Sequence, residues 1–117
     1  MEFQLRCKIW LENKGDKVFG DGPWDLLKRV ERLGSLRQAA AEINMSYSQA
    51  WHLISTLEKN LGYPLLAKKA GGAKGGYSVI TSEGICILRA YDNFRREAQE
   101  SLESLFEKHF EQAFNNN

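Results

Sequence analysis

The sequence has little of what secreted, metal-binding or membrane-spanning proteins need. Its 117 residues include two cysteines, Cys7 and Cys86, too few for a disulfide scaffold and not spaced as a metal-binding pair. Both fall on apolar faces, so we expect buried free thiols. The longest apolar runs are far too short to cross a membrane, and no signal peptide begins the chain. These absences predict a cytoplasmic protein with no membrane association, metal or cofactor.

A strong net charge is also missing, since the formal value is +1. The distribution is more informative than the total. Residues 28–74 carry eight basic side chains against three acidic ones, whereas residues 97–111 carry five acidic ones against a single lysine. A basic middle and an acidic tail suit a DNA-facing domain with a solvent-facing helix behind it. Catalysis is not indicated, because no nucleophile has a nearby base and His52 and His109 lack ligand-like companions.

The stretch from Gly34 to Gly62 predicts two helices joined by a short turn. Ser35 is followed three residues later by Gln38, and Ser46 by Gln49, and both pairs are typical of capping boxes at helix starts. The predicted helices run over residues 36–43 and 47–60, with the turn at residues 44–45 and a glycine stop at residue 62.

The faces of these helices indicate what the pair does. Apolar residues at helical spacing form the buried stripes: Leu36, Ala39, Ala40 and Ile43 in the first helix, and Ala50, Ile54, Leu57 and Leu61 in the second. The N-terminal half of the second helix leaves polar and aromatic side chains off the core: Tyr47, Ser48, Gln49, Trp51, His52 and Ser55. Such a helix start suits base reading in a DNA major groove. An ordinary helical hairpin with a polar outer face is the alternative.

Upstream, the pattern predicts a strand hairpin and one more helix. Phe3 to Leu11 alternate apolar and polar residues, residues 12–16 are turn material, and residues 17–19 return as a second strand. Trp10 lies on the polar face, covered by a neighbouring element or by another chain. The helix over residues 24–33 is expected to have Pro23 at its first position and Asp21 or Gly22 as its cap. Its cations, Lys28, Arg29 and Arg32, either face solvent or contact phosphates.

Downstream, residues 65–68 and 77–80 can pair across the glycine-rich residues 69–76. A phosphate-binding nucleotide loop would need Gly-Lys-Ser/Thr leading into a helix, but here Lys74 is followed by Gly75 and then by a strand. A wing that presses bare backbone and lysines against DNA phosphates is the better interpretation, with a flexible hairpin tip as the alternative. The expected phosphate contacts are Ser35, Arg37, Ser46, Lys68, Lys69, Lys74 and Gly75.

The last helix, capped by Thr81, is predicted from Glu83 to about Phe110. At about 40 Å it outruns the core of so small a domain, so we expect its apolar side to meet the same helix of a second subunit. That seam approximates a heptad, interrupted by Arg95 and His109. The dimerisation candidates are Leu88, Tyr91, Phe94, Ala98, Leu102 and Leu105. A helix folded back on its own hairpin is the alternative.

Together these segments resemble a known family. The run GSLRQAAAEINMSYSQAW, the segment KNLGYPLLAKK, the glycine wing and the TSEG start of the last helix resemble the winged helix-turn-helix of LysR-type regulators. The leading hairpin, the Ser46-Tyr47-x-x-Ala50-Trp51 helix start and the GGAKGG wing are similar to ModE-type molybdate-dependent regulators, over Leu5 to about Leu105. The resemblance implies transcriptional regulation through duplex DNA. Such regulators carry C-terminal oxyanion-binding domains, and this chain ends before one could begin, so we expect no molybdate binding from it.

The predicted fold class is mainly α with small β, a winged helix-turn-helix with an N-terminal β-hairpin and a long C-terminal dimerisation helix. We expect the DNA-binding domain over residues 1–81, the dimerisation helix over 82–112 and a disordered tail over 113–117. A homodimer would read a two-fold site with half-sites about one turn apart. Gln49 can bond an adenine edge and Ser48 either base type, while Trp51 either reads DNA or packs. A dimeric protein-interaction module and a non-specific architectural DNA binder stay open.

Overall fold

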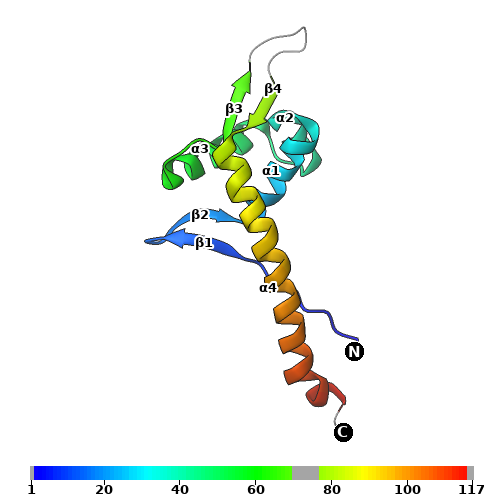
Figure 1. The fold of residues 1–117 in the computed structure, drawn as a ribbon. Helices are drawn as coiled ribbons and strands as arrows, with labels where there is room; N and C mark the ends of the chain where they lie inside the picture. Colours follow the sequence, from blue (N-terminus) through cyan, green and yellow to red (C-terminus); the bar gives the residue numbers. More distant parts are fainter. Residues whose placement is uncertain (1, 70–76, 116–117) are drawn as a thin grey trace.

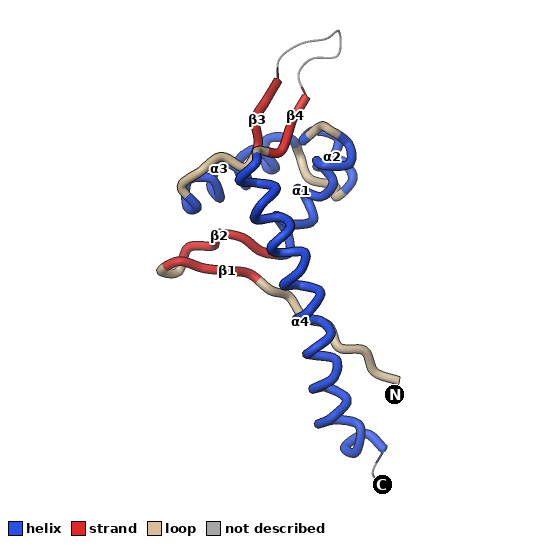
Figure 2. The backbone as a smooth tube through the Cα atoms, in the orientation of Figure 1, coloured by secondary structure: helices blue, strands red, loops and turns tan. Residues whose placement is uncertain are grey.

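The computed structural model describes residues 2–69 and 77–115. A two-stranded hairpin comes first, followed by three helices, a second hairpin and one long helix (Figure 1). The helices dominate, and each sheet has two antiparallel strands (Figure 2). The predicted mainly α winged helix-turn-helix with a leading hairpin and a long last helix is therefore confirmed. No described helix is long and apolar enough to span a membrane.

The first hairpin consists of β1 (Trp10–Asn13) and β2 (Asp16–Gly20). Lys14 and Gly15 form the turn with φ of 52° and 88°, the left-handed pair that a tight type I′ connection requires. The prediction that a strand starts at Phe3 is wrong, because β2 is too short to pair with residues before Trp10. Trp10 is half covered by its own hairpin: its indole N–H donates to Glu12, and the ammonium of Lys17 lies 5.8 Å from its ring centroid.

Helix α1 (Asp21–Leu33) begins earlier than predicted. Its cap is Gly20, not Asp21 or Gly22, and Pro23 is the third helical residue rather than the first. Proline is tolerated there because the amides of the first turn have no intrahelical partner. A side chain at Gly20 would meet the Trp10 Cβ at 2.7 Å, so the tight passage from β2 into α1 needs glycine. The helix ends at Gly34 in the left-handed conformation.

Helices α2 (Leu36–Glu42) and α3 (Tyr47–Leu61) form the expected helix-turn-helix. The capping box at Ser46 and Gln49 is complete. At Ser35 it is half formed, since the hydroxyl accepts from the Gln38 amide but the described chain shows no return bond from the Gln38 side chain. Gly62 stops α3 with φ of 88°. Ala39 and Ala40 of α2 and Ala50 of α3 are fully buried, and α2 packs against both α1 and α3, so these small side chains suit a close approach of the helices.

The second hairpin, β3 (Leu66–Lys69) and β4 (Tyr77–Ile80), is the wing. Its base is fixed from both sides. The Ser78 amide donates to the Gly34 carbonyl at 3.0 Å, and the Ser78 hydroxyl accepts from the Leu36 amide at 3.3 Å. The carboxylate of Glu58 accepts from the Leu65 and Leu66 amides at 2.7 and 3.1 Å. The wing is thus attached to the turn before α2 and to the end of α3.

Helix α4 (Ser82–Asn115) starts at the base of the wing, passes the helical body and continues beyond it (Figure 1). The Thr81 hydroxyl caps it by accepting from the Gly84 amide at 2.9 Å. A side chain at Gly84 would lie 2.6 Å from the Leu65 carbonyl oxygen, so this close approach requires glycine. The helix outlasts the predicted end at Phe110. Residues 113–115, expected in the tail, are helical, and residues 116–117 lie outside the described part.

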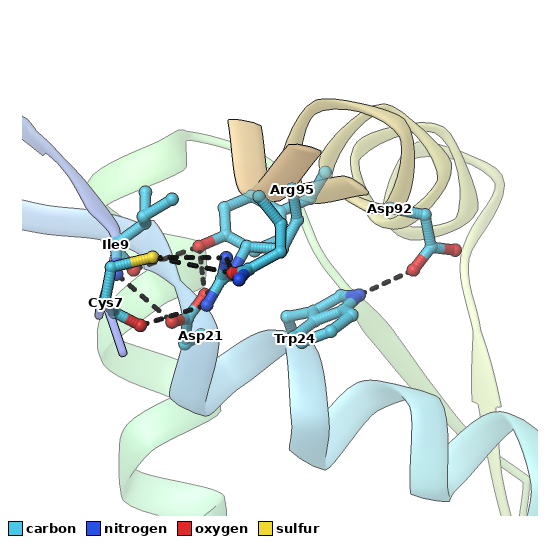
Figure 3. Close-up of polar contacts among 8 residues, drawn as sticks. Cys7, Ile9, Asp21, Trp24, Asp92 and Arg95 are labelled. Carbon is cyan, nitrogen blue, oxygen red and sulfur yellow. Dashed lines mark hydrogen bonds and ion pairs between the residues drawn. The ribbon is translucent and has the colours of Figure 1, made fainter. Parts of the chain in front are cut away.

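Asp21 ties three distant segments together (Figure 3). One carboxylate oxygen accepts from the Tyr91 hydroxyl at 2.6 Å and from Arg95 Nε at 3.0 Å, and the other accepts from the Ile9 amide at 3.1 Å. Arg95 also donates to the Cys7 carbonyl at 3.0 Å. This network, here called the Asp21 lock, holds the N-terminal segment against α1 and α4.

The lock shifts the ionisation of its members. Burial alone would raise the pKa of Asp21, but the hydrogen bonds from Tyr91 and the Ile9 amide, together with Arg95, hold it below its ordinary value. Burial, and then the Asp21 carboxylate, raise the pKa of Tyr91. The expected buried thiols are not found: Cys7 is half-buried beside the lock, and Cys86 is exposed because it lies on the outer side of α4.

Candidate nucleic-acid interface

The first turns of α3 meet the wing at a cluster of cations and aromatic rings. Tyr47 and Trp51 are one helical turn apart, so their side chains share a face of α3. The ammonium of Lys68, from β3, lies 5.0 Å from the Tyr47 ring centroid and 4.3 Å from that of Trp51. The guanidinium of Arg37, from α2, lies 4.2 Å from the Tyr47 centroid. We call these four residues the cation–aromatic cluster. It joins α2, α3 and the wing.

A groove of about 480 Å³ opens beside the cluster. Its walls include the α1–α2 turn, the start of α2 and both strands of the wing, with Ser35, Arg37, Tyr47, Lys68 and Tyr77 among its lining residues. The polar and cationic lining suits an anionic backbone better than an apolar ligand.

The cations of this groove differ from those on α1. No carboxylate of the described residues, which include every Asp and Glu of the chain, lies within 4.0 Å of Arg37 or Lys68. On α1, by contrast, Lys28 pairs with Asp92, Arg29 with Asp25 and Glu42, and Arg32 with Glu42. From the sequence, these three residues either face solvent or contact phosphates. The ion pairs give all three a partner within the chain.

Among the expected base contacts, Gln49 has a competing role. Its Oε1 accepts from the Ser46 amide at 3.0 Å within the capping box. A bidentate contact with adenine uses both the oxygen and the nitrogen of the amide, so Gln49 would have to leave the cap to make it. The Nε2 of Gln49 has no partner among the described residues, so this atom can still donate to a base edge.

The other five candidates lie on the outer side of α3. Ser48, His52 and Trp51 are exposed, the last by 39%, and Tyr47 and Ser55 are half-buried. Trp51 is therefore outside the core, with its ring face against Lys68. The six residues lie within the first nine residues of α3, and their contacts with bases stay a prediction.

The expected phosphate contacts are only partly brought together. Ser35, Arg37 and Lys68 line the groove. The hydroxyl oxygens of Ser35 and Ser46 act as helix caps, and each hydroxyl keeps a proton to donate. Lys69 occupies the last position of β3, opposite Tyr77. Lys74 and Gly75 lie outside the described residues.

Sequence reasoning missed two residues of this region, Tyr77 and Ser78. Tyr77 is exposed in the groove, and Ser78 is buried and fastens the wing to the start of α2. The signal was present in the period-two alternation of residues 77–80, which places Ser78 on the opposite face from Tyr77 and Val79.

The predicted dimerisation seam is divided by the fold. Leu88 and Tyr91 are 0% and 3% exposed because they pack in the core of their own chain, so their assignment to a subunit contact is wrong for the fold described. Phe94 and Leu105 are 49% and 48% exposed, and Ala98 and Leu102 are half-buried.

Comparison with known proteins identifies the family to which this arrangement belongs. Residues 24–84, from α1 through the helix-turn-helix and wing to the start of α4, match the family described as "Bacterial regulatory helix-turn-helix protein, lysR family". The chain belongs to this LysR family. The match includes the cation–aromatic cluster and its groove, and it ends at the third residue of α4.

Curated relatives extend the likeness. The "Molybdenum transport protein ModE" of Azotobacter vinelandii is 36% identical over 83 residues, 71% of this chain and 31% of the relative. The "Transcriptional regulator ModE" of Haemophilus influenzae is 32% identical over 80 residues, 68% of this chain and 31% of the relative. The "Molybdenum-pterin-binding protein MopB" of Rhodobacter capsulatus is 34% identical over 105 residues, 88% of this chain and 38% of the relative. The chain thus spans about a third of their length. Family and relatives together support a DNA-binding transcriptional regulator.

Proposed function

We propose that this LysR-family chain binds duplex DNA as a homodimer, with the start of α3 in the major groove and the wing on the adjacent backbone. The observation that carries the proposal is the cation–aromatic cluster. Arg37 and Lys68 have no acidic partner within the described residues, and both stand beside the exposed start of α3. Lysine and arginine held in this way neutralise phosphates, which fixes the register of a base-reading helix.

The homodimer is supported by an apolar surface that includes Tyr91 and Phe94 of the predicted seam and adds residues outside it. Leu11 of the first hairpin and Ile87, Ala90 and Phe94 of α4 line a largely apolar groove of about 220 Å³. Leu11 is 43% exposed and Phe94 49%, and large exposed apolar side chains gathered in this way mark contact surfaces. A second copy of the chain is the occupant that two-fold DNA recognition requires.

Sedimentation of a Phe94→Glu variant tests the dimer. A glutamate at the centre of this surface should shift the protein to monomers at micromolar concentration, and Arg96→Glu, on another side of the same helix, should leave the mass unchanged. A Phe94→Glu protein that sediments as the wild type does would place the subunit contact elsewhere.

The experiment for the function as a whole is a selection from sheared genomic duplex DNA. Retained fragments are then titrated at several salt concentrations. Enrichment of one inverted repeat, bound far more tightly than random DNA, is the expected result. Retention without a shared sequence, lost steeply with salt, would indicate an architectural binder. Absence of retention at low salt would contradict DNA binding and favour a protein partner.

Molybdenum stays outside this proposal. The names of two of the relatives refer to it, but the matched segment is about a third of each of those proteins. Duplex DNA is therefore the only partner that we assign, besides a second copy of the chain.

A further inference from the structure

We propose that Tyr47 is a positioning residue, whose ring holds Arg37 and Lys68 together so that both converge on one backbone phosphate. The inference rests on the proposed DNA binding and assigns a different role to a residue that the sequence suggests as a base reader.

The first support is the geometry of the two cations. Arg37 comes from α2 and Lys68 from β3, more than thirty residues away in sequence. The Arg37 guanidinium lies 4.2 Å and the Lys68 ammonium 5.0 Å from the centroid of the Tyr47 ring. The two charges therefore cannot be further apart than the sum of these two distances. Two like charges repel one another at such a range. The electron-rich π-system of the ring offsets part of this repulsion, and a bound phosphate would offset the rest.

The second support is the position of the ring. Tyr47 is half-buried in the groove between α2 and the wing, whereas Ser48 and His52 of the same helix are exposed. A side chain whose ring contacts cations from two other elements has little freedom to reach a base edge. The same contacts keep two long, flexible side chains ordered, which lowers the entropy lost when they bind phosphate.

Trp51 extends the arrangement by one helical turn. The Lys68 ammonium lies against both rings, so it connects the wing to two successive turns of α3. The occupant of the site is a phosphate of the DNA backbone that passes between the start of α2 and the wing. A free phosphate ion would meet the same two cations, but it would not gain from the base contacts of α3.

The test compares Tyr47→Phe with Tyr47→Leu in the full chain. Phe keeps the ring and removes the hydroxyl, whereas Leu keeps apolar volume and removes the ring. We expect Tyr47→Phe to bind as the wild type does. Tyr47→Leu should lose about two- to fivefold in affinity for each cation released, on specific and random DNA alike, with a flatter dependence on salt. Inorganic phosphate added as a competitor should displace DNA only at concentrations at which any salt does.

Three results would overturn the proposal. Tyr47→Leu could bind both DNAs as tightly as the wild type does, which would leave the ring without a role. Tyr47→Phe could lose preference at one base position, which would make the hydroxyl a base reader. Tyr47→Phe could also weaken both DNAs equally, which would assign the phosphate contact to the hydroxyl. If the wild type itself fails to bind duplex DNA at low salt, the proposed function fails first, and the comparison of variants is not reached.

A second measurement needs no variant. Protons near the face of an aromatic ring shift upfield in NMR spectra, so the δ-methylene protons of Arg37 should be upfield of their random-coil position in the free wild-type protein. They should stay upfield in the complex with DNA. Random-coil shifts in the folded protein would mean that Arg37 does not lie on the ring, even if Tyr47→Leu proves too unstable to study.

Discussion

Two groups of cations lie within one small domain and differ in their partners. Arg29 and Arg32 on α1 share the carboxylate of Glu42, and Arg95 on α4 is held by Asp21. Arg37 and Lys68 contact aromatic rings and, in the part of the chain that the structure describes, no carboxylate. A cation with an internal acid has its charge compensated within the fold, and using it for DNA would mean breaking that pair. A cation on a ring keeps its charge available. The position of the acids, more than the number of basic residues, therefore separates the cations that are paired within the fold from those that we propose for DNA.

The largest expected effect is on stability and concerns the paired group. Asp21→Asn removes the charge that faces Arg95, whose side chain is 16% exposed, and weakens the link between the N-terminal segment, α1 and α4. Leaving a mostly buried arginine without its carboxylate should lower the free energy of unfolding by about 2 kcal/mol. Urea denaturation followed by circular dichroism measures it.

The matched control is Asp25→Asn, which makes the same change at a carboxylate that is 49% exposed. It should have a much smaller effect, because exposed ion pairs contribute little. Equal losses in the two variants would mean that burial does not distinguish these pairs.

The same lock should make folding sensitive to acid. The pKa of Asp21 lies below its ordinary value in the folded chain, because hydrogen bonds and Arg95 outweigh the effect of burial. Its contribution is therefore fully present above the unfolded pKa of about 4, and it is lost as pH falls through the lower folded value. Unfolding free energies measured between pH 6 and about pH 2 should fall more steeply for the wild type than for Asp21→Asn. Parallel curves would show that Asp21 titrates alike in both states.

Local signals in the sequence predicted the helix-turn-helix because the relevant interactions are local. The Ser46 and Gln49 spacing marks the start of α3, and Gly62 ends it, through bonds between residues three or four apart. The Asp21 lock could not be read in this way, since it joins residues that are 12 to 88 positions apart. For the same reason, Leu88 and Tyr91 were assigned to a subunit contact: an apolar helix face does not say whether its own core or another chain covers it.

The candidate site shows the same limit. Sequence pattern placed Tyr47 and Trp51 on one face of α3, but the cations that lie on their rings come from α2 and β3. Only the folded chain brings them together. The expected lysines of the wing tip stay a prediction.

The next effect concerns DNA and the unpaired group. Lys68→Gln should weaken binding to specific and random DNA by about tenfold at 0.1 M salt and lower the salt slope by about one unit, with little change in stability. Arg32→Gln is the matched control on α1, and it should leave the affinity within about twofold. Fluorescence anisotropy at several salt concentrations measures both. Similar losses for the two variants would remove the distinction between paired and unpaired cations.

The smallest effect is also the sharpest test of that distinction. Glu42→Gln keeps the shape of the side chain but removes the charge that Arg29 and Arg32 share, so Arg32 loses its carboxylate partner and Arg29 keeps only Asp25. The pKa of Glu42 is held below its ordinary value by hydrogen bonds from Arg32 and Arg29. If the position of a cation decides whether it meets DNA, the affinity of Glu42→Gln for random DNA should stay unchanged. Only its stability should fall, by less than that of Asp21→Asn. If pairing alone decides, the released arginines should raise the affinity for random DNA and steepen its salt dependence. Salt titration of random duplex DNA separates the two outcomes, and a steeper slope in Glu42→Gln would show that the fold keeps these arginines from DNA by pairing them.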